Sequence, residues 1–362
     1  MNRLKAVQEL GQSIWLDFIR RDLLTGGKLR QMVAEGIRGM TSNPTIFQQA
    51  IAGSTEYDAD ITAILKAEPG IATQDLYERL AVEDIRMTAD ILRPVYAQSG
   101  KVDGMVSLEV SPRLADDAEG TLAEARRLWR LVDRPNLMIK VPATPAGIRA
   151  GAPLIAEGIN VNFTLMFSLG HYDAVAHAYL GGLEKTPRPA EVTSVASFFV
   201  SRVDTYVDRA LEKIGTPAAL ALRGRAAIAN TRLAYRRFRE IFDGAEFAAL
   251  KKRGARVQRP LWGSTSTKNP AYSDVLYLEN LIGPDTVNTV PPDALEAFLD
   301  HGKARPTLEE GGEETEKVLA ELGKLGVDLD AITEQLQVDG VKAFADSFEK
   351  LLAALEEKRH AG

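Results

Sequence analysis

The chain contains no cysteine among its 362 residues. This absence excludes disulfide bonds, thiolate zinc sites and cysteine nucleophiles, and it is compatible with a cytoplasmic setting. Histidine is scarce as well, because only four are present and they form no HExxH pair. We therefore expect no metal site.

Long apolar runs and an excess of positive charge are also missing. No uninterrupted apolar stretch of about 18 residues occurs, and the N-terminal segment lacks an apolar core of signal-peptide length, so we expect a cytoplasmic protein with no membrane partner. The net charge is -6, with 44 basic and 50 acidic residues, which argues against nucleic acid as a partner. Two basic stretches, 222–242 and 251–259, are better interpreted as solvated helix surface, because the first keeps an apolar stripe.

What the sequence does contain is an alternation of short apolar runs with longer helical patterns. This alternation is typical of βα units and a parallel sheet. Eight such units favour an α/β fold of the (β/α)8 TIM-barrel type. An open, doubly wound sheet is the main alternative, but no GxGxxG turn follows the first strand. The predicted strands are 13–19, 37–43, 103–111, 136–143, 158–167, 192–199, 259–266 and 286–292.

Two regions exceed a minimal barrel. The segment 48–99 has the periodicity of two or three helices inserted after the second strand. We therefore expect a barrel domain at 1–305, containing this insertion, and a helical C-terminal extension at 306–362. The last helix of the extension has an apolar face that we expect to pack on the barrel, although a partner subunit could cover it instead, and the sequence does not choose between a monomer and a homodimer. This face consists of Val341, Phe344, Phe348, Leu351, Leu352 and Leu355.

Lys140 is the most unusual residue of a predicted strand core, because it lies within the apolar run Leu137–Met138–Ile139–Lys140–Val141. A buried ammonium is costly, so such a side chain reaches solvent, finds a counter-ion or gives up its proton. The third outcome produces an amine nucleophile. The stretch alone leaves open the simpler interpretation that Lys140 ends a strand and reaches water.

Nearly every predicted strand also carries a polar side chain near its C-terminal end. In a parallel barrel these ends converge on the face that holds the active site. A lone Ser, Thr or Asn is more often engaged in local hydrogen bonds, but a lysine with two carboxylates and several neutral polar groups suits Schiff-base chemistry. The residues concerned are Asp17, Asn43, Glu109, Lys140, Asn162, Thr164, Ser197 and Ser266.

Two basic side chains could hold a charged end of a substrate. Arg202 follows the sixth strand at a helix start, and Lys268 follows the seventh. Both positions suit a phosphate group, which favours basic side chains and the backbone donors of helix N-termini. On spacing alone, Arg202 could equally pair with Asp204 or Asp208 on the surface of its helix.

The motifs around these residues resemble those of the transaldolase family. They are TSNPTIF, SLEVSPRLA, IKVPATPAGIRA, NVNFTLMFS, SVASFFVSRVD and STSTKNPAYSD, in family order. The resemblance runs from about Ile14 to about His301, and the tail is similar to that of the longer bacterial members. It implies transfer of a dihydroxyacetone unit from fructose 6-phosphate or sedoheptulose 7-phosphate to glyceraldehyde 3-phosphate or erythrose 4-phosphate, in the non-oxidative pentose phosphate pathway, with no cofactor.

The resemblance also implies roles for individual residues. Lys140 is similar to the Schiff-base lysine, Asp17 to the acid/base at the C4 hydroxyl of the substrate, and Glu109 with Thr164 to the pair that holds a catalytic water. Lys268 departs from the shorter transaldolases, which have an arginine there, and so keeps the charge but loses the bidentate fork. The remaining implied roles are dihydroxyacetone binding by Asn43, Asn162 and Ser197, an aromatic wall at Phe199, and phosphate binding by Arg202 and Ser266.

Three other functions remain open at this point. A related aldolase would release free dihydroxyacetone instead of holding it for an acceptor. A sugar-phosphate-binding or scaffolding protein would keep the pocket without turnover. A pyridoxal-phosphate enzyme would use the nucleophilic lysine to hold its cofactor.

Overall fold

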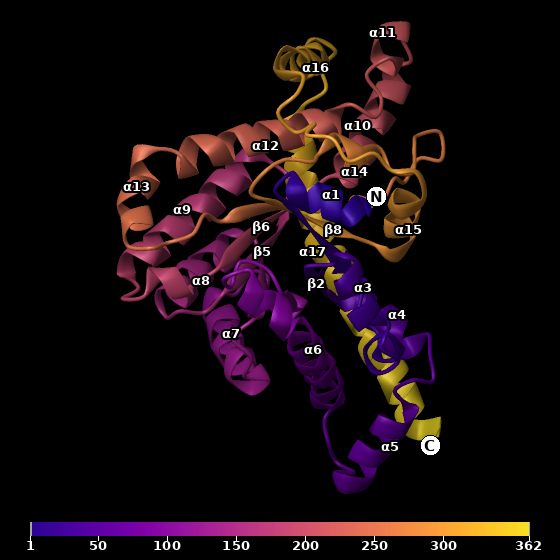
Figure 1. Ribbon diagram of the computed structural model, residues 1–362. Coiled ribbons are helices and arrows are strands. Elements are labelled where there is room, and N and C mark those ends of the chain that lie inside the picture. Colours follow the sequence, from indigo (N-terminus) through magenta and orange to yellow (C-terminus); the bar gives the residue numbers. More distant parts are fainter. Residues whose placement is uncertain (1, 362) are drawn as a thin grey trace.

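The computed structural model describes residues 2–361, and its centre is a closed barrel of eight parallel strands (Figure 1). Each strand pairs with its neighbour in sequence, and β1 also pairs with β8, which closes the sheet. The expected (β/α)8 barrel is therefore confirmed, and the open sheet is excluded. The strands are β1 (Gln12–Asp17), β2 (Gly39–Thr41), β3 (Met105–Glu109), β4 (Leu137–Pro142), β5 (Val161–Met166), β6 (Ser194–Phe199), β7 (Arg259–Gly263) and β8 (Thr286–Val290).

Most of the strands are shorter than the sequence pattern predicts, and β2 shows why. The apolar run predicted a strand over 37–43, but the ladder ends at Thr41. Asn43 accepts a hydrogen bond from the backbone N–H of Ile46 and so caps helix α4 (Pro44–Ala52), in which Pro44 is the first helical residue. The polar end of the predicted strand is therefore already the start of the next helix.

The insertion after the second strand consists of three helices, in agreement with the predicted segment. They are α4, α5 (Asp58–Ala67) and α6 (Thr73–Gln98). The other helices before β6 are α1 (Arg3–Glu9), α2 (Arg21–Thr25), α3 (Lys28–Glu35), η1 (Pro112–Leu114), α7 (Ala118–Val132), α8 (Pro145–Ala156), α9 (Leu169–Lys185) and η2 (Pro189–Glu191). Those after β6 are α10 (Ser201–Ile214), α11 (Pro217–Leu220), α12 (Ala226–Phe242), α13 (Ala245–Lys252), α14 (Leu276–Asn280), α15 (Pro292–His301), α16 (Gly312–Lys324) and α17 (Leu329–Ala361).

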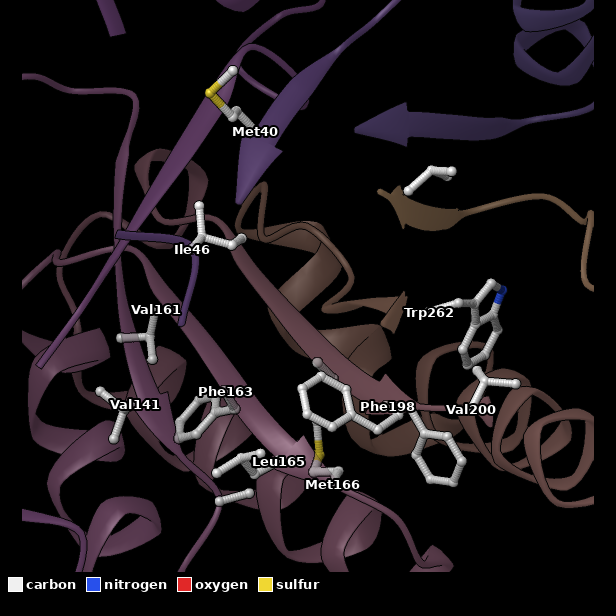
Figure 2. Packing of buried hydrophobic residues seen from close by; sticks show 14 of the residues in the cluster. Met40, Ile46, Val141, Val161, Phe163, Leu165, Met166, Phe198, Val200 and Trp262 are labelled. Carbon is white, nitrogen blue, oxygen red and sulfur yellow. The ribbon is translucent and has the colours of Figure 1, made fainter. Parts of the chain in front are cut away.

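The core has two parts, because side chains of a strand alternate between the inside and the outside of the barrel. The outer part lies between strands and helices, where Phe163 of β5 packs near Phe198 of β6 (Figure 2). The ring of Phe163 also contacts Gly151 of α8, and it leaves no space there for a side chain. The inner part is a smaller apolar cluster that fills the middle of the barrel and includes Trp15, Met105, Met138, Val195, Leu261 and Val287.

The C-terminal extension ends in one long helix, α17, which runs alongside α4 toward α5 (Figure 1, yellow). It also contacts α10 and β5. Phe344, Phe348, Leu351 and Leu355 of the predicted apolar face are buried, whereas Val341 and Leu352 are only partly covered. This face therefore packs on the rest of the same chain.

The basic stretch of α12 is paired with carboxylates. Arg236 contacts Glu316 at 2.8 Å and Arg237 contacts Asp173 at 2.6 Å. Arg239 contacts Asp243 at 2.8 Å. These ion pairs support the interpretation of the stretch 222–242 as a solvated helix surface. For the stretch 251–259 the same interpretation is wrong, because helix α13 ends at Lys252 and the stretch ends at the buried Arg259 of β7. Separately, none of the helices within residues 2–361 is both long and apolar enough to span a bilayer.

Candidate active site

The register of the barrel brings the predicted site residues into one ring. Glu109 on β3 lies opposite Lys140 on β4, and Lys140 lies opposite Asn162 on β5. Asp17 at the end of β1 lies opposite Thr41 on β2 in the same way. Because alternate residues share a face, these side chains point into the barrel at its C-terminal end, where barrel enzymes hold their active sites.

Lys140 is buried and paired, so it does not reach solvent. Its exposed fraction is 4%. The Nζ atom donates to Glu109 Oε2 at 3.0 Å and to the backbone carbonyl of Ser42 at 3.1 Å. Of the three outcomes that the sequence left open, the structure shows the second, in which Lys140 pairs with a counter-ion. An amine attacks a carbonyl carbon only in its unprotonated form.

Glu109 is suited to receive the proton of Lys140. Burial raises the pKa of its carboxyl group, while the neighbouring ammonium of Lys140 opposes this shift. Its second oxygen, Oε1, and the hydroxyl of Thr164 are both buried and have no hydrogen-bond partner among residues 2–361. Two such unsatisfied polar atoms next to a reacting amine are suited to hold a water molecule.

Asp17 is a second carboxylate of the site, partly buried at the end of β1 and separated from β3 by β2. Burial raises the pKa of Asp17, and Lys140 is the largest opposing influence. The hydroxyl of Thr41 donates to Asp17 Oδ1 at 2.7 Å and lies 2.5 Å from the hydroxyl of Thr289. Sequence reasoning missed both threonines, although the same rule of polar residues at strand ends would have found them.

The neutral polar residues form a second network beside Lys140. Ser197 donates to Asn162 Oδ1 at 2.7 Å, and Asn162 Nδ2 donates to Ser107 Oγ at 2.9 Å. These two hydrogen bonds fix the amide orientation of Asn162 and hold the hydroxyl of Ser197 at the pocket wall. Asn43 uses its Oδ1 to cap α4, which leaves its Nδ2 donors for a ligand.

A cleft of about 730 Å³ joins most of these residues. Glu109 and Asn162 do not line it, but each forms a hydrogen bond with a residue that does, Glu109 with Lys140 and Asn162 with Ser197. The structure also adds Phe344 of α17 to the lining, which the sequence assigned only to a packing face. The predicted residues that line the cleft are Asp17, Asn43, Lys140, Thr164, Ser197, Phe199, Arg202, Ser266 and Lys268.

One end of the cleft carries two cations that face no carboxylate partner. Asp204 and Asp208, the alternative partners of Arg202, each accept instead from a backbone N–H and a tyrosine hydroxyl. Within residues 2–361, neither Arg202 nor Lys268 forms an ion pair, and Lys268 donates to Ser266 Oγ at 2.6 Å. Burial lowers the pKa of both basic groups. An anion at this end would relieve that cost.

Phe199 forms the wall between the lysine and this cationic end. Its ring lies against Gly263 of β7, where an added Cβ would come within 2.7 Å of a ring carbon. The guanidinium of Arg202 lies 5.5 Å from the centre of the same ring. The glycine therefore makes room for the aromatic wall, and the wall supports the arginine. No cluster of three His, Asp or Glu side chains within residues 2–361 could hold a metal ion.

Comparison of the sequence with known proteins identifies its family. Residues 14–355 match the family described as Transaldolase/Fructose-6-phosphate aldolase, and the match extends into α17. The chain is 50% identical to a transaldolase of Thiobacillus denitrificans, over 98% of this chain and all of that protein. It is 47% identical to a transaldolase of Frankia alni, over 99% of this chain and 97% of that protein. It therefore belongs to the transaldolase/fructose-6-phosphate aldolase family.

Proposed function

We propose that the protein is a transaldolase, which moves a dihydroxyacetone unit from a ketose phosphate to an aldose phosphate through a Schiff base on Lys140. The observation that carries this proposal is the buried Lys140–Glu109 pair, at 3.0 Å, in a cleft that ends at two unpaired cations. Both relatives named above are transaldolases, and each matches this chain over nearly its whole length. The donors are fructose 6-phosphate and sedoheptulose 7-phosphate, and the acceptors are glyceraldehyde 3-phosphate and erythrose 4-phosphate.

The first step is imine formation. Glu109 takes the proton of Lys140, and the free amine attacks the C2 carbonyl of the ketose. The resulting hydroxyl leaves as water after it receives a proton, and a water molecule held between Glu109 Oε1 and the hydroxyl of Thr164 carries that proton. The buried, unsatisfied state of both atoms supports this role.

The second step is cleavage of the bond between C3 and C4. Asp17 takes the proton of the C4 hydroxyl, the bond electrons move into the iminium group, and the aldose phosphate leaves. The raised pKa of the Asp17 carboxyl suits a group that accepts and later returns a proton. Arg202, Lys268 and Ser266 hold the phosphate. Asn43 and Ser197 orient the hydroxyls of the retained unit, and Asn162 contributes through its hydrogen bond with Ser197.

The third step reverses the second with another aldose. The enamine carbon forms a bond to the acceptor carbonyl carbon, and Asp17 returns its proton to the new hydroxyl. Hydrolysis of the imine then releases the new ketose phosphate and restores the amine. The chemistry needs no metal or organic cofactor, because the iminium group itself serves as the electron sink.

The same proposal covers the organisation of the chain. The barrel domain, with its insertion at 48–99, occupies residues 1–305 and carries the proposed catalytic groups, and residues 306–362 form an extension packed on it. The partners are small sugar phosphates, and we place the protein in the cytoplasm. We expect a monomer or a homodimer.

A coupled assay tests the proposal. Purified protein receives fructose 6-phosphate with or without erythrose 4-phosphate, and sedoheptulose 7-phosphate and free dihydroxyacetone are both measured. We expect transfer with the acceptor and little release without it. Equal release in both conditions would make the protein an aldolase, while ligand binding without any product would make it a binding protein. An absorbance scan for a bound chromophore tests the pyridoxal-phosphate alternative.

A further inference from the structure

Helix α17 is docked on the strand ends that carry the reacting groups. Gln337 is 8% exposed, and its Nε2 donates to the carbonyls of Ala143 and Leu165, both at 3.0 Å. Ala143 follows β4, three residues after Lys140, and Leu165 directly follows Thr164 on β5. One side chain of α17 therefore joins the two strands that hold the amine and the proposed water-binding hydroxyl.

The backbone of β5 is adapted to this contact. Leu165 has a φ of 61°, in the left-handed region that a branched side chain rarely adopts. The pairing of β5 with β6 shifts register between Phe163 and Met166 at the same place. The carbonyl of Leu165 accepts its hydrogen bond from Gln337 of α17 instead.

Gly340 lets the helix approach closely. A Cβ added there would lie 3.0 Å from Leu165 Cδ2 and 3.8 Å from Arg202 Nη1. Two further polar contacts hold the helix on each side of this point, from Tyr206 to Asp339 at 2.6 Å and from Thr45 to Ser347 at 2.9 Å. The helix is therefore seated over the cleft by contacts with α10, β5 and α4.

Phe344 follows Gly340 by one helical turn and covers the lysine. It lines the cleft, is 4% exposed, and its ring centre lies 5.4 Å from Lys140 Nζ. An aromatic ring at this distance excludes water from one side of the amine.

We propose that Phe344 determines how the reaction intermediate is partitioned, because it shields the intermediate on Lys140 from water and so favours transfer over release. Gln337 is the positioning residue that holds it there. This inference rests on the proposed transaldolase function.

In transfer, the enamine carbon bonds the acceptor carbonyl carbon and the acceptor oxygen receives a proton from Asp17. In release, the same carbon takes a proton from water, and a further water adds to the iminium carbon and expels the Lys140 amine as dihydroxyacetone leaves.

The test compares Phe344→Ala with wild type in two measurements on the full chain. One is release of free dihydroxyacetone from fructose 6-phosphate without acceptor, and the other is transfer to erythrose 4-phosphate. We expect the ratio of release to transfer to rise about tenfold or more, because the shield against a competing reaction with water is removed. A ratio equal to that of wild type would overturn the proposal.

Three further variants separate shielding from general loosening. Leu355→Ala removes a buried side chain of the same helix that does not line the cleft, and we expect it to leave the ratio unchanged. Phe344→Leu keeps an apolar cover and should give a smaller rise, and it replaces the alanine variant if that one does not fold. Gln337→Met removes both hydrogen bonds and should raise the ratio by less than Phe344→Ala.

The outcomes also separate this inference from the proposed function. If wild type shows neither transfer nor release, the proposed function fails before Phe344 is tested. If wild type transfers and Leu355→Ala raises the ratio as much as Phe344→Ala, the position of the helix matters and the ring does not. If wild type transfers and only Phe344→Ala, Phe344→Leu and Gln337→Met raise the ratio, the shielding role is supported.

Discussion

Two buried ion pairs lie inside the barrel, one at each end. At the N-terminal end, Arg259 contacts Asp103 at 2.8 Å, with side-chain exposures of 8% and 10%. Arg259 also donates to Ser13 and to the carbonyl of Val102, while Asp103 also accepts from Ser13 and from Trp15. Both carboxylate oxygens of Asp103 therefore have partners, and neither member of this pair lines the cleft beside Lys140.

At the C-terminal end, Lys140 contacts Glu109 at 3.0 Å, with exposures of 5% and 3%. One oxygen of Glu109 has no partner within residues 2–361, and Lys140 lines the cleft. The two pairs are similarly buried, so burial does not distinguish them. The difference is unused hydrogen-bonding capacity beside open space, and it marks the pair that can react.

The largest expected effect comes from Lys140→Met. We expect transfer activity to fall at least about 10⁴-fold, because the nucleophile is gone. We expect the free energy of unfolding to change by less than about 2 kcal/mol, because burial already raises the pKa of Glu109 and the carboxyl can stay protonated. Urea unfolding and the coupled assay measure the two quantities, and a loss of stability as large as that of the next variant would remove the contrast.

Arg259→Met should give the opposite pattern. The substitution leaves Asp103 buried without its cation, so we expect the free energy of unfolding to fall by about 3–5 kcal/mol. Activity per folded molecule, measured well below the unfolding transition, should stay within a few fold of wild type. A loss of activity without a loss of stability would place Arg259 in the catalytic machinery and contradict the comparison.

Asp204 extends the comparison to a buried carboxylate that has hydrogen bonds but no cation. Burial raises its pKa to about 7. In the unfolded chain the Asp204 carboxyl has its ordinary pKa of 3.8. The proton that Asp204 binds in the folded protein therefore stabilises the fold at low pH, and this stabilisation is lost as the pH rises to about 7. We expect Asp204→Asn to flatten the pH dependence of unfolding in this window, by no more than about 4 kcal/mol. Identical pH profiles for both proteins would contradict the raised pKa.

Lys268→Arg should have the smallest effect. A guanidinium can hold a phosphate with two parallel hydrogen bonds, whereas an ammonium acts as a point charge. We therefore expect KM for fructose 6-phosphate to fall by a few fold with kcat nearly unchanged. Lys268→Gln, which removes the charge, serves as the control and should raise KM. An unchanged KM in both variants would mean that Arg202 alone holds the phosphate.

Of the two buried ion pairs, the sequence predicted the residues of the Lys140–Glu109 pair but not those of the Arg259–Asp103 pair. The eight apolar runs predicted the strands, and the rule of polar residues at strand ends brought Lys140, Glu109 and Asp17 together. The Arg259–Asp103 pair was not predicted. Asp103 precedes β3 and Arg259 begins β7, and these two strands are far apart in sequence, so the two side chains meet only when the barrel closes. Phe344 was predicted only as a packing residue, because a helix face that covers a cleft has the same periodicity as one that covers a core.

Trapping of the imine tests the central claim most directly, because it identifies the lysine amine that reacts. The protein is incubated with fructose 6-phosphate and borohydride, digested, and its peptides are analysed by mass spectrometry. The account predicts a reduced dihydroxyacetone adduct on the peptide that carries Lys140, and its loss in Lys140→Met. An adduct on another lysine, or no adduct in a protein that still transfers the unit, would contradict the account.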